Sequence, residues 1–160
     1  MGLGCIKCCI CSIPDEPVPQ NKPKEIISND IKENIVTSKK VQKDLIVDDS
    51  DPNRIIIKRY LMRTNRIADE AINGEEAIKI IKETGTYNII WMDVQMPKMN
   101  GIKCTDHLRN VLNYKGTIIG LTGHVDLDSV NDCKKAGMQD VLAKPIDKKL
   151  LEMYIEKYQK

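Results

Sequence analysis

Short runs of aliphatic residues alternate with longer amphipathic segments from residue 44 to the end of this 160-residue chain. Ile, Val and Leu dominate the runs, and the segments between them have helical periodicity and a length of about ten to fifteen residues. This alternation is typical of βαβ units, which build a parallel sheet with helices on its faces. The predicted strands are residues 44–48, 66–71, 88–93, 117–121 and 140–143.

Capping residues mark where the helices between these strands begin. Ser50 or Asp51 can cap a first helix that carries Pro52 in its first turn. Asn73 and Gly74 come directly before two glutamates and predict the start of a second helix. Right-handed crossovers between such units give a doubly wound sheet, in which the loops at the carboxyl ends of the strands form any binding site.

Side-chain spacing and a helix stop support the same arrangement. Ala77, Ile80 and Ile81 are spaced i, i+3 and i+4, so we expect them on one buried face of the second helix. Gly137 follows two lysines and predicts the end of the fourth helix. The fifth helix is expected over residues 147–158, close to the end of the chain.

Three acidic residues stand at the carboxyl ends of two predicted strands. Asp48 and Asp49 close the first strand, and Asp93 closes the third. If these strands are neighbours, the carboxylates converge, and like charges packed together must be neutralised or paired. Oxygen-only ligands favour Mg²⁺, and such an ion can bridge a carboxylate and a phosphoryl group. The alternative, that each acid only caps a helix or faces solvent, stays open for any one of them alone.

A lysine and a threonine follow two other predicted strands. Lys144 comes after the fifth strand and directly before Pro145, so its ammonium can reach the same edge of the sheet and pair with an aspartate or a phosphoryl oxygen. Thr122 ends the fourth strand next to Gly123, where its hydroxyl can donate to a phosphoryl oxygen. Alone, a lysine at a strand end is usually a solvated charge, and Thr before Gly is usually a turn.

Together these residues resemble the receiver domain of two-component response regulators, of the type found in hybrid histidine kinases. The resemblance covers essentially all of residues 44–160 and implies a flavodoxin-like (βα)₅ domain with the sheet order 2-1-3-4-5. Its motifs occur in the family's order. They are LIVDDSDPNR at residues 45–54, WMDVQMPKMNG at 91–101, IIGLTGH at 118–124 and AKP at 143–145.

The resemblance assigns roles at the acidic edge. It implies that Asp93 accepts a phosphoryl group from a phosphohistidine of a histidine kinase or histidine phosphotransfer protein. Asp49 and Asp93 would bind Mg²⁺ directly, Asp48 would help through water, and the main-chain carbonyl of Gln95 would supply a further ligand. The implied protein is a signalling domain that catalyses only its own phosphorylation and dephosphorylation.

The resemblance also implies a conformational switch that controls the binding of a downstream protein target. Thr122 would move toward the phosphoryl group, and Lys144 would bond it through a peptide that the family usually holds cis before its proline. Receivers commonly carry Tyr or Phe three residues before the lysine, where this chain has Val141. The aromatic half of the switch is therefore in doubt. His124 and Gln95 lie where receivers vary and can tune the phosphoryl lifetime.

Three other functions remain to be weighed. A haloacid-dehalogenase-type phosphatase also uses an aspartate that ends a strand, but its usual second aspartate would stand at Gln95. A flavin-binding flavodoxin would need a hydroxyl- and glycine-rich phosphate loop after the first strand, where Asp48 and Asp49 repel phosphate. A receiver fold without phosphoryl chemistry would act only as an interaction module, and the intact acidic set argues against it.

Composition and charge divide the chain into a tail, residues 1–43, and a receiver domain, residues 44–160. The tail has seven lysines against five acids, whereas the remainder is balanced at eighteen of each, which makes nucleic-acid binding an unlikely function. The tail is rich in Pro and Cys and is expected to be a flexible linker. Since no domain is expected after the fifth helix, the protein is expected to be a stand-alone receiver. The longest apolar run falls far short of the roughly 20 residues needed to span a bilayer, and the N-terminus lacks a continuous signal-peptide core, so a cytoplasmic protein is expected.

The first residues resemble a dually acylated head. Myristate on Gly2 and palmitate on Cys5, Cys8 or Cys9 would tether the protein to a membrane surface, and a second acyl chain is needed because one myristate binds only weakly. Ile6 replaces the usual Ser or Thr and weakens this prediction. An unmodified leader and a zinc site remain as alternatives, although the clustered thiols can hardly surround a tetrahedral ion.

Overall fold

The computed structural model describes residues 41–159. The predicted acylation sites Gly2, Cys5, Cys8 and Cys9 lie outside the described residues. In the part of the chain that the structure describes, no helix has both the length and the apolar character needed to cross a bilayer.

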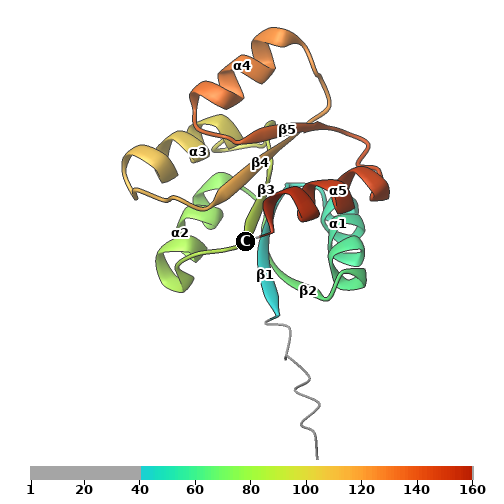
Figure 1. The fold of residues 1–160 in the computed structure, drawn as a ribbon. Coiled ribbons are helices and arrows are strands. Elements are labelled where there is room, and N and C mark those ends of the chain that lie inside the picture. The colour runs from blue at the N-terminus through green and yellow to red at the C-terminus, as the bar shows by residue number, and fades with distance from the viewer. Residues whose placement is uncertain (1–40, 160) are drawn as a thin grey trace, which may run out of the picture. The chain divides into compact units, whose positions relative to one another are not determined.

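Five parallel strands form one sheet in the order β2-β1-β3-β4-β5, and a helix follows each strand (Figure 1). The flavodoxin-like (βα)₅ fold and its strand order are therefore confirmed. The strands are β1 (Gln42–Val47), β2 (Arg66–Ala71), β3 (Ile89–Asp93), β4 (Thr117–Thr122) and β5 (Asp140–Ala143). The helices are α1 (Asp51–Arg63), α2 (Gly74–Thr84), α3 (Gly101–Asn110), α4 (Leu127–Lys135) and α5 (Lys148–Tyr158).

Two hydrophobic clusters cover the two faces of the sheet. Helices α1 and α5 lie side by side on one face, where Ile57 and Leu61 pack with Leu151 and Ile155 (Figure 1). Helices α2, α3 and α4 contribute the other cluster. The central strands β1 and β3 supply side chains to both clusters, which is why residues 45–47 of β1 and 89–92 of β3 are continuously apolar. The carboxyl edge of the sheet is left to polar side chains.

The predicted elements agree with the structure except at some ends. The first strand is predicted over residues 44–48 and is observed from Gln42 to Val47. It begins earlier because Gln42 and Lys43 extend the ladder with β2. Ser50 is the N-cap of α1, and Asn73 caps α2 by accepting from the Glu76 N–H at 3.0 Å.

On the buried face of α2, Ala77 and Ile81 are enclosed as predicted, whereas Ile80 is only half-buried and Ile78 is enclosed in addition. Gly137 follows α4 with a φ of 105°, a backbone conformation that favours glycine.

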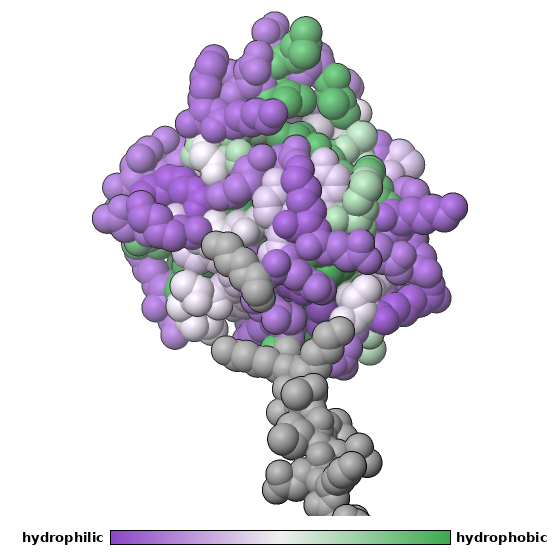
Figure 2. All heavy atoms as spheres, viewed as in Figure 1, coloured by the Kyte–Doolittle hydropathy of each residue, from purple (hydrophilic) through white to green (hydrophobic). Residues whose placement is uncertain are grey.

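The outer surface is mostly hydrophilic on the face shown in Figure 2. Hydrophobic residues gather at the top of that view, where Figure 1 places α4. Leu127, the first residue of α4, is 82% exposed, and Val125 in the preceding loop is 58% exposed. The domain thus presents aliphatic side chains to solvent around the start of α4.

Candidate functional site

The register of the central strands brings the acidic residues together. In the β1–β3 ladder Val47 pairs with Met92, so the next residues along both strands, Asp48 and Asp93, emerge at the same edge. Asp48, Asp49 and Asp93 each offer one carboxylate oxygen, and these three oxygens lie within 4.8 Å of one another. Asp48 and Asp93 are buried, and Asp49 is exposed. The convergence predicted from the sequence is present.

Lys144 reaches this acidic cluster from the loop after β5. Its Nζ lies 2.7 Å from Oδ2 of Asp48 and 2.8 Å from Oδ2 of Asp93, so one ammonium bridges the two buried carboxylates. The Lys144–Pro145 peptide is cis, as expected from the resemblance. The side chain of Lys144 retains 20% exposure, which keeps the cluster open to solvent on one side.

Burial and charge act against each other at this cluster. Burial raises the pKa of the Asp93 carboxyl, Asp48 adds repulsion, and the bond to Lys144 only partly offsets these effects. Burial lowers the pKa of the Lys144 ammonium, but its bonds to Asp48 and Asp93 outweigh the burial and raise that pKa above its usual value. Since three carboxylates face one ammonium, the site favours a further cation.

Backbone and amide donors fix the buried carboxylates. Oδ1 of Asp48 accepts from the Ser50 N–H at 2.9 Å, and the amide of Asn53 donates to both oxygens of Asp48 at 3.1 and 3.2 Å. The Gln95 N–H donates to Asp93 at 3.2 Å. The loop after β3 thus folds back on Asp93, while the assignment of the Gln95 carbonyl as a metal ligand stays a prediction.

Gly101, the first residue of α3, allows this loop to close tightly. A Cβ at this position would lie 2.1 Å from the main-chain oxygen of Asp93, so a larger residue would displace the loop after β3. The Gly101 N–H donates to the Val94 carbonyl at 3.0 Å, which completes the turn.

Thr122 is buried at the end of β4 and bonds within its own loop. Its Oγ1 donates to the His124 carbonyl at 2.9 Å and accepts from the His124 N–H at 3.1 Å. The Thr122 carbonyl accepts from the Lys144 N–H at 2.7 Å. The hydroxyl is therefore satisfied by the loop in this structure, and a role at a phosphoryl group would require it to leave these two bonds.

The variable positions differ in their surroundings. Val141 is half-buried and packs against the hydrophobic cluster under α4, so the position of the expected aromatic is filled by a small aliphatic side chain. His124 and Gln95 are exposed beside the site, and the structure leaves their predicted effect on phosphoryl lifetime open.

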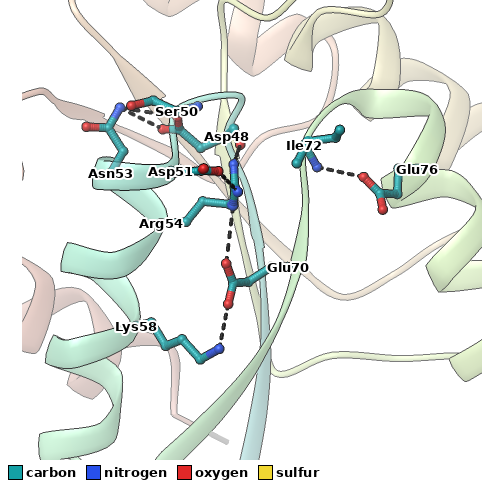
Figure 3. Close-up of polar contacts among 9 residues, drawn as sticks. All are labelled: Asp48, Ser50, Asp51, Asn53, Arg54, Lys58, Glu70, Ile72 and Glu76. Carbon is teal, nitrogen blue, oxygen red and sulfur yellow. Dashed lines mark hydrogen bonds and ion pairs between the residues drawn. The ribbon is translucent and has the colours of Figure 1, made fainter.

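Two residues of α1 belong to the site but were absent from the sequence-based prediction. Asn53 holds the Asp48 carboxylate, as described above. Arg54 donates from Nη1 to the main-chain oxygen of Asp48 at 2.8 Å (Figure 3). A signal for Arg54 exists in the sequence, because it shares a helical stripe with Ile57 and Leu61 at i+3 and i+7, and a buried arginine requires partners.

The donor set fits a hard divalent cation. The three converging groups are all carboxylates, and such oxygen ligands suit Mg²⁺. Receiver domains bind Mg²⁺ at an acidic pocket, and this cluster has that chemical character. Asp48, Asp49 and Asp93 are the residues that would hold the ion, and it would supply positive charge beside an incoming phosphoryl group.

A doubly wound sheet with a buried aspartate, a bridging lysine and a threonine at its carboxyl edge is the arrangement expected of a receiver-type signalling domain. The family model of the response regulator receiver domain matches residues 45–156. The chain therefore belongs to the response regulator receiver family, as the motifs indicated.

Relatives and a solved structure agree with this assignment. The osmosensing histidine protein kinase SLN1 of Saccharomyces cerevisiae is 35% identical over 119 residues, which are 71% of this chain and 10% of that protein. Two-component response regulator 24 of Arabidopsis thaliana is 36% identical over 102 residues, which are 64% of this chain and 73% of that protein. The CheX–CheY–BeF₃–Mg²⁺ complex of Borrelia burgdorferi has a TM-score of 0.67 and 29% identity, covering 74% of this chain and 90% of the matched one.

Proposed function

We propose that the chain accepts a phosphoryl group from a phosphohistidine onto Asp93 in a Mg²⁺-dependent reaction. The observation that carries this proposal is the convergence of Asp48, Asp49 and Asp93 with Lys144 bridging the two buried acids. One of the solved structures similar to this chain is a complex that contains Mg²⁺. In this proposal the three carboxylates would hold the ion, and Asp93 would also be the nucleophile. Lys144 would pair with the negative charge of the carboxylate and of the phosphoryl group.

The transfer exchanges one bond for another at phosphorus. An oxygen of the Asp93 carboxylate attacks, the phosphorus–nitrogen bond of the donor breaks, and the imidazole keeps the bond's electron pair and is protonated. Lys144 lies 2.8 Å from Asp93 and can follow the charge as it moves from the carboxylate to the phosphoryl oxygens. Its second partner, Asp48, keeps the ammonium at the site throughout.

Phosphorylation of Asp93 would replace a carboxylate of one negative charge with an acyl phosphate of about two at the edge of the sheet. Thr122 is the hydroxyl at the end of the neighbouring strand, and its bonds to His124 can be exchanged for one to a phosphoryl oxygen. Because the Thr122 carbonyl is bonded to the Lys144 N–H, a shift of this loop also reaches the segment after β5. The changed surface would then select the downstream protein.

The proposed donor is a histidine kinase or a histidine phosphotransfer protein, since receiver domains interact with such proteins.

The proposal also includes attachment of the protein to the cytoplasmic face of a membrane by its acylated N-terminus. This part rests on Gly2, Cys5, Cys8 and Cys9 in the sequence alone. Mass analysis of protein from its native cells tests it, and unmodified Gly2 and cysteines would end it.

Incubation with acetyl phosphate and Mg²⁺, followed by intact mass measurement, tests the phosphoacceptor. Wild type is expected to gain one phosphoryl adduct that is lost with hydroxylamine, because an acyl phosphate forms. Asp93→Asn is expected to show no adduct, and EDTA is expected to prevent the adduct on wild type. The matched control is Asp106→Asn, an exposed aspartate of α3, which is expected to behave as wild type.

The rival functions give different results in the same assay. An absent adduct on folded wild type with Mg²⁺ would favour the interaction module and contradict the proposal. Sustained turnover of assorted phosphomonoesters would favour the phosphatase.

A further inference from the structure

Arg54 ties the first turn of α1 to the acidic loop and to β2. Its Nη1 donates to the main-chain oxygen of Asp48 at 2.8 Å, its Nε donates to Glu70 at 3.2 Å, and its Nη2 bonds Asp51 (Figure 3). Arg54 is only 8% exposed, and its bond to the Asp48 main-chain oxygen is buried, so this bond is formed with little competition from water. A guanidinium held at three points in one plane is a rigid anchor.

The oxygen that Arg54 holds belongs to the peptide that joins Asp48 to Asp49. That peptide plane sets the direction in which the Asp49 side chain leaves the backbone. The preceding peptide is also held, since the Asp48 N–H donates to the Ala71 carbonyl at 3.1 Å. The backbone of the acidic pair is thus fixed on both sides of Asp48.

Asp49 depends on this backbone more than its neighbours do. The Asp48 carboxylate is held directly by Lys144, Asn53 and the Ser50 N–H. Within residues 41–159, by contrast, no hydrogen bond or ion pair reaches the exposed Asp49 carboxylate, although one of its oxygens lies with those of Asp48 and Asp93. Only the main chain aims Asp49 at the cluster.

We propose that Arg54 is a positioning residue for the metal site, which acts through the Asp48–Asp49 peptide to direct the Asp49 carboxylate at the bound cation. This inference rests on the proposed function, because it assigns a role within the Mg²⁺ site. Arg54 is not one of the residues that would hold the ion, and its effect would be transmitted by one peptide plane.

Glu70 keeps the guanidinium in place from the β2 side. Its Oε2 accepts from Arg54, and its Oε1 lies 2.5 Å from Nζ of Lys58 (Figure 3). The bond to Lys58 lowers the pKa of the Glu70 carboxyl against the effect of burial, and the bond to Arg54 lowers it further. Glu70 therefore stays ionised and holds Arg54 at neutral pH.

A simple charge effect of Arg54 would have the opposite sign. A cation near a metal site repels the metal, so loss of the Arg54 charge alone would strengthen Mg²⁺ binding. Loss of positioning would weaken it, since groups that orient metal ligands commonly account for about 10–100-fold in metal affinity. The direction of the change therefore separates the two roles.

Calorimetric titration of the unphosphorylated protein with Mg²⁺ measures this direction. Arg54→Gln and Arg54→Lys are both expected to bind Mg²⁺ at least about 10-fold more weakly than wild type. Glutamine lacks the charge and the guanidinium, and lysine keeps the charge but lacks the planar set of guanidinium donors. The matched control is Arg59→Gln, which removes an exposed arginine of the same helix and is expected to stay within about twofold of wild type. Glu70→Gln, which loosens the anchor and keeps Arg54, is expected to fall between them.

Two further measurements distinguish positioning from general destabilisation. In the metal-free protein, the carbonyl ¹³C resonance of Asp48 is expected to shift in Arg54→Gln, because its hydrogen bond is lost, while core resonances stay in place. In the acetyl phosphate assay, the Mg²⁺ concentration for half-maximal rate is expected to rise about 10-fold, with a maximal rate near that of wild type. If Arg54→Gln does not fold by circular dichroism, Arg54→Lys and Glu70→Gln carry the same test.

The outcomes separate this inference from the proposed function. Wild type that binds Mg²⁺ and forms the adduct, with Arg54 variants that bind Mg²⁺ equally well or more tightly, would overturn the positioning role alone. Wild type that binds no Mg²⁺ would overturn both.

Discussion

Two fully buried aspartates lie near the two ends of strand β1, one within the strand and one just after it, and they are held in different ways. Asp44 near the amino end and Asp48 just past the carboxyl end both have 0% exposure. Asp44 lies in a shell of hydrogen-bond donors, four residues before Asp48 in the sequence. Asp48 lies beside two more carboxylates and a lysine that is 20% exposed.

The shell around Asp44 uses both carboxylate oxygens. Arg66 donates from Nε at 2.9 Å and from Nη2 at 2.6 Å, the Ile89 N–H donates at 3.2 Å, and the Trp91 Nε1–H donates at 3.2 Å. Arg66 is itself 1% exposed. The Asp44 carboxylate thus links β1, β2 and β3, with Arg66 as its charged partner.

The difference shows how an acidic residue that stabilises the fold can be distinguished from one that belongs to a binding site. Burial alone does not distinguish Asp44 from Asp48, because both are enclosed. What differs is the balance of charge: one carboxylate faces one arginine at Asp44, whereas three carboxylates share one lysine at the carboxyl edge. The charges of the first arrangement balance, although Nη1 of Arg66 has no hydrogen-bond partner among the described residues, whereas the second arrangement favours a further cation.

The largest expected effect tests the closed end. Arg66→Met removes one partner of a buried ion pair and leaves Asp44 charged and enclosed, so we expect a loss of about 3–5 kcal/mol in the free energy of unfolding. Urea denaturation measures this loss. Arg59→Met, an exposed arginine on α1, is the matched control and is expected to change stability by less than about 0.5 kcal/mol.

A loss below about 1 kcal/mol for Arg66→Met would break the comparison, because the pair would then behave as an exposed one. The folded fraction of Arg66→Met is expected to form the phosphoryl adduct at the rate of wild type, since Arg66 lies at the opposite end of the sheet from Asp93.

The next effect tests the open end. Lys144→Met removes the cation that bridges Asp48 and Asp93, and we expect the rate of adduct formation to fall about 10²–10³-fold, as for loss of one group that stabilises a transition-state charge. Intact mass against time with saturating Mg²⁺ measures the rate. Lys148→Met, on the half-buried first residue of α5, serves as the control and is expected to retain the wild-type rate.

A Lys144→Met variant that forms the adduct at the wild-type rate would show that the bridge is only structural. If the same variant also lost a large part of its free energy of unfolding, this result would likewise indicate that the Lys144 bridge has a structural role.

Much of the open site could be predicted from the sequence because it depends on strand ends. Each of the five predicted site residues stands at the end of an apolar run, and parallel strands bring such residues to one edge of the sheet. These residues are Asp48, Asp49, Asp93, Thr122 and Lys144. The three aspartates lie together in the structure, and Lys144 bonds two of them. The Thr122 hydroxyl, by contrast, bonds its own loop. The direction of a hydroxyl depends on loop geometry that the sequence pattern does not contain.

The closed pair could not be predicted in the same way. Arg66 pairs with Gln42 in the ladder, and its side chain reaches Asp44 two residues along the neighbouring strand. That contact depends on the strand register, which alternation of apolar residues does not determine for a strand buried on both faces. Arg54 was missed for another reason: its helical stripe signals burial, but not that its partner is a main-chain oxygen.

The smallest of the three effects concerns the pH dependence of the two ends without metal. Since burial raises the pKa of the Asp93 carboxyl above its unfolded value, the folded state binds this proton more tightly than the unfolded state. The contribution of Asp93 to the stability of wild type in EDTA should therefore fall as pH rises from the unfolded pKa of about 3.9 through the higher folded pKa. At pH 7 the ionised carboxylate lowers stability by its full amount.

Asp93→Asn removes this ionisation, so in EDTA it should be more stable than wild type at pH 7, and the difference should vanish below the unfolded pKa. Asp44→Asn should show the opposite sign at pH 7, because it leaves the buried Arg66 without its charged partner. Urea denaturation of the three proteins between pH 3 and pH 8 compares the ends of β1 directly. Equal destabilisation by both substitutions at pH 7 would mean that the carboxyl edge is as complete as the Asp44 shell, and the argument for a bound cation would lose its electrostatic basis.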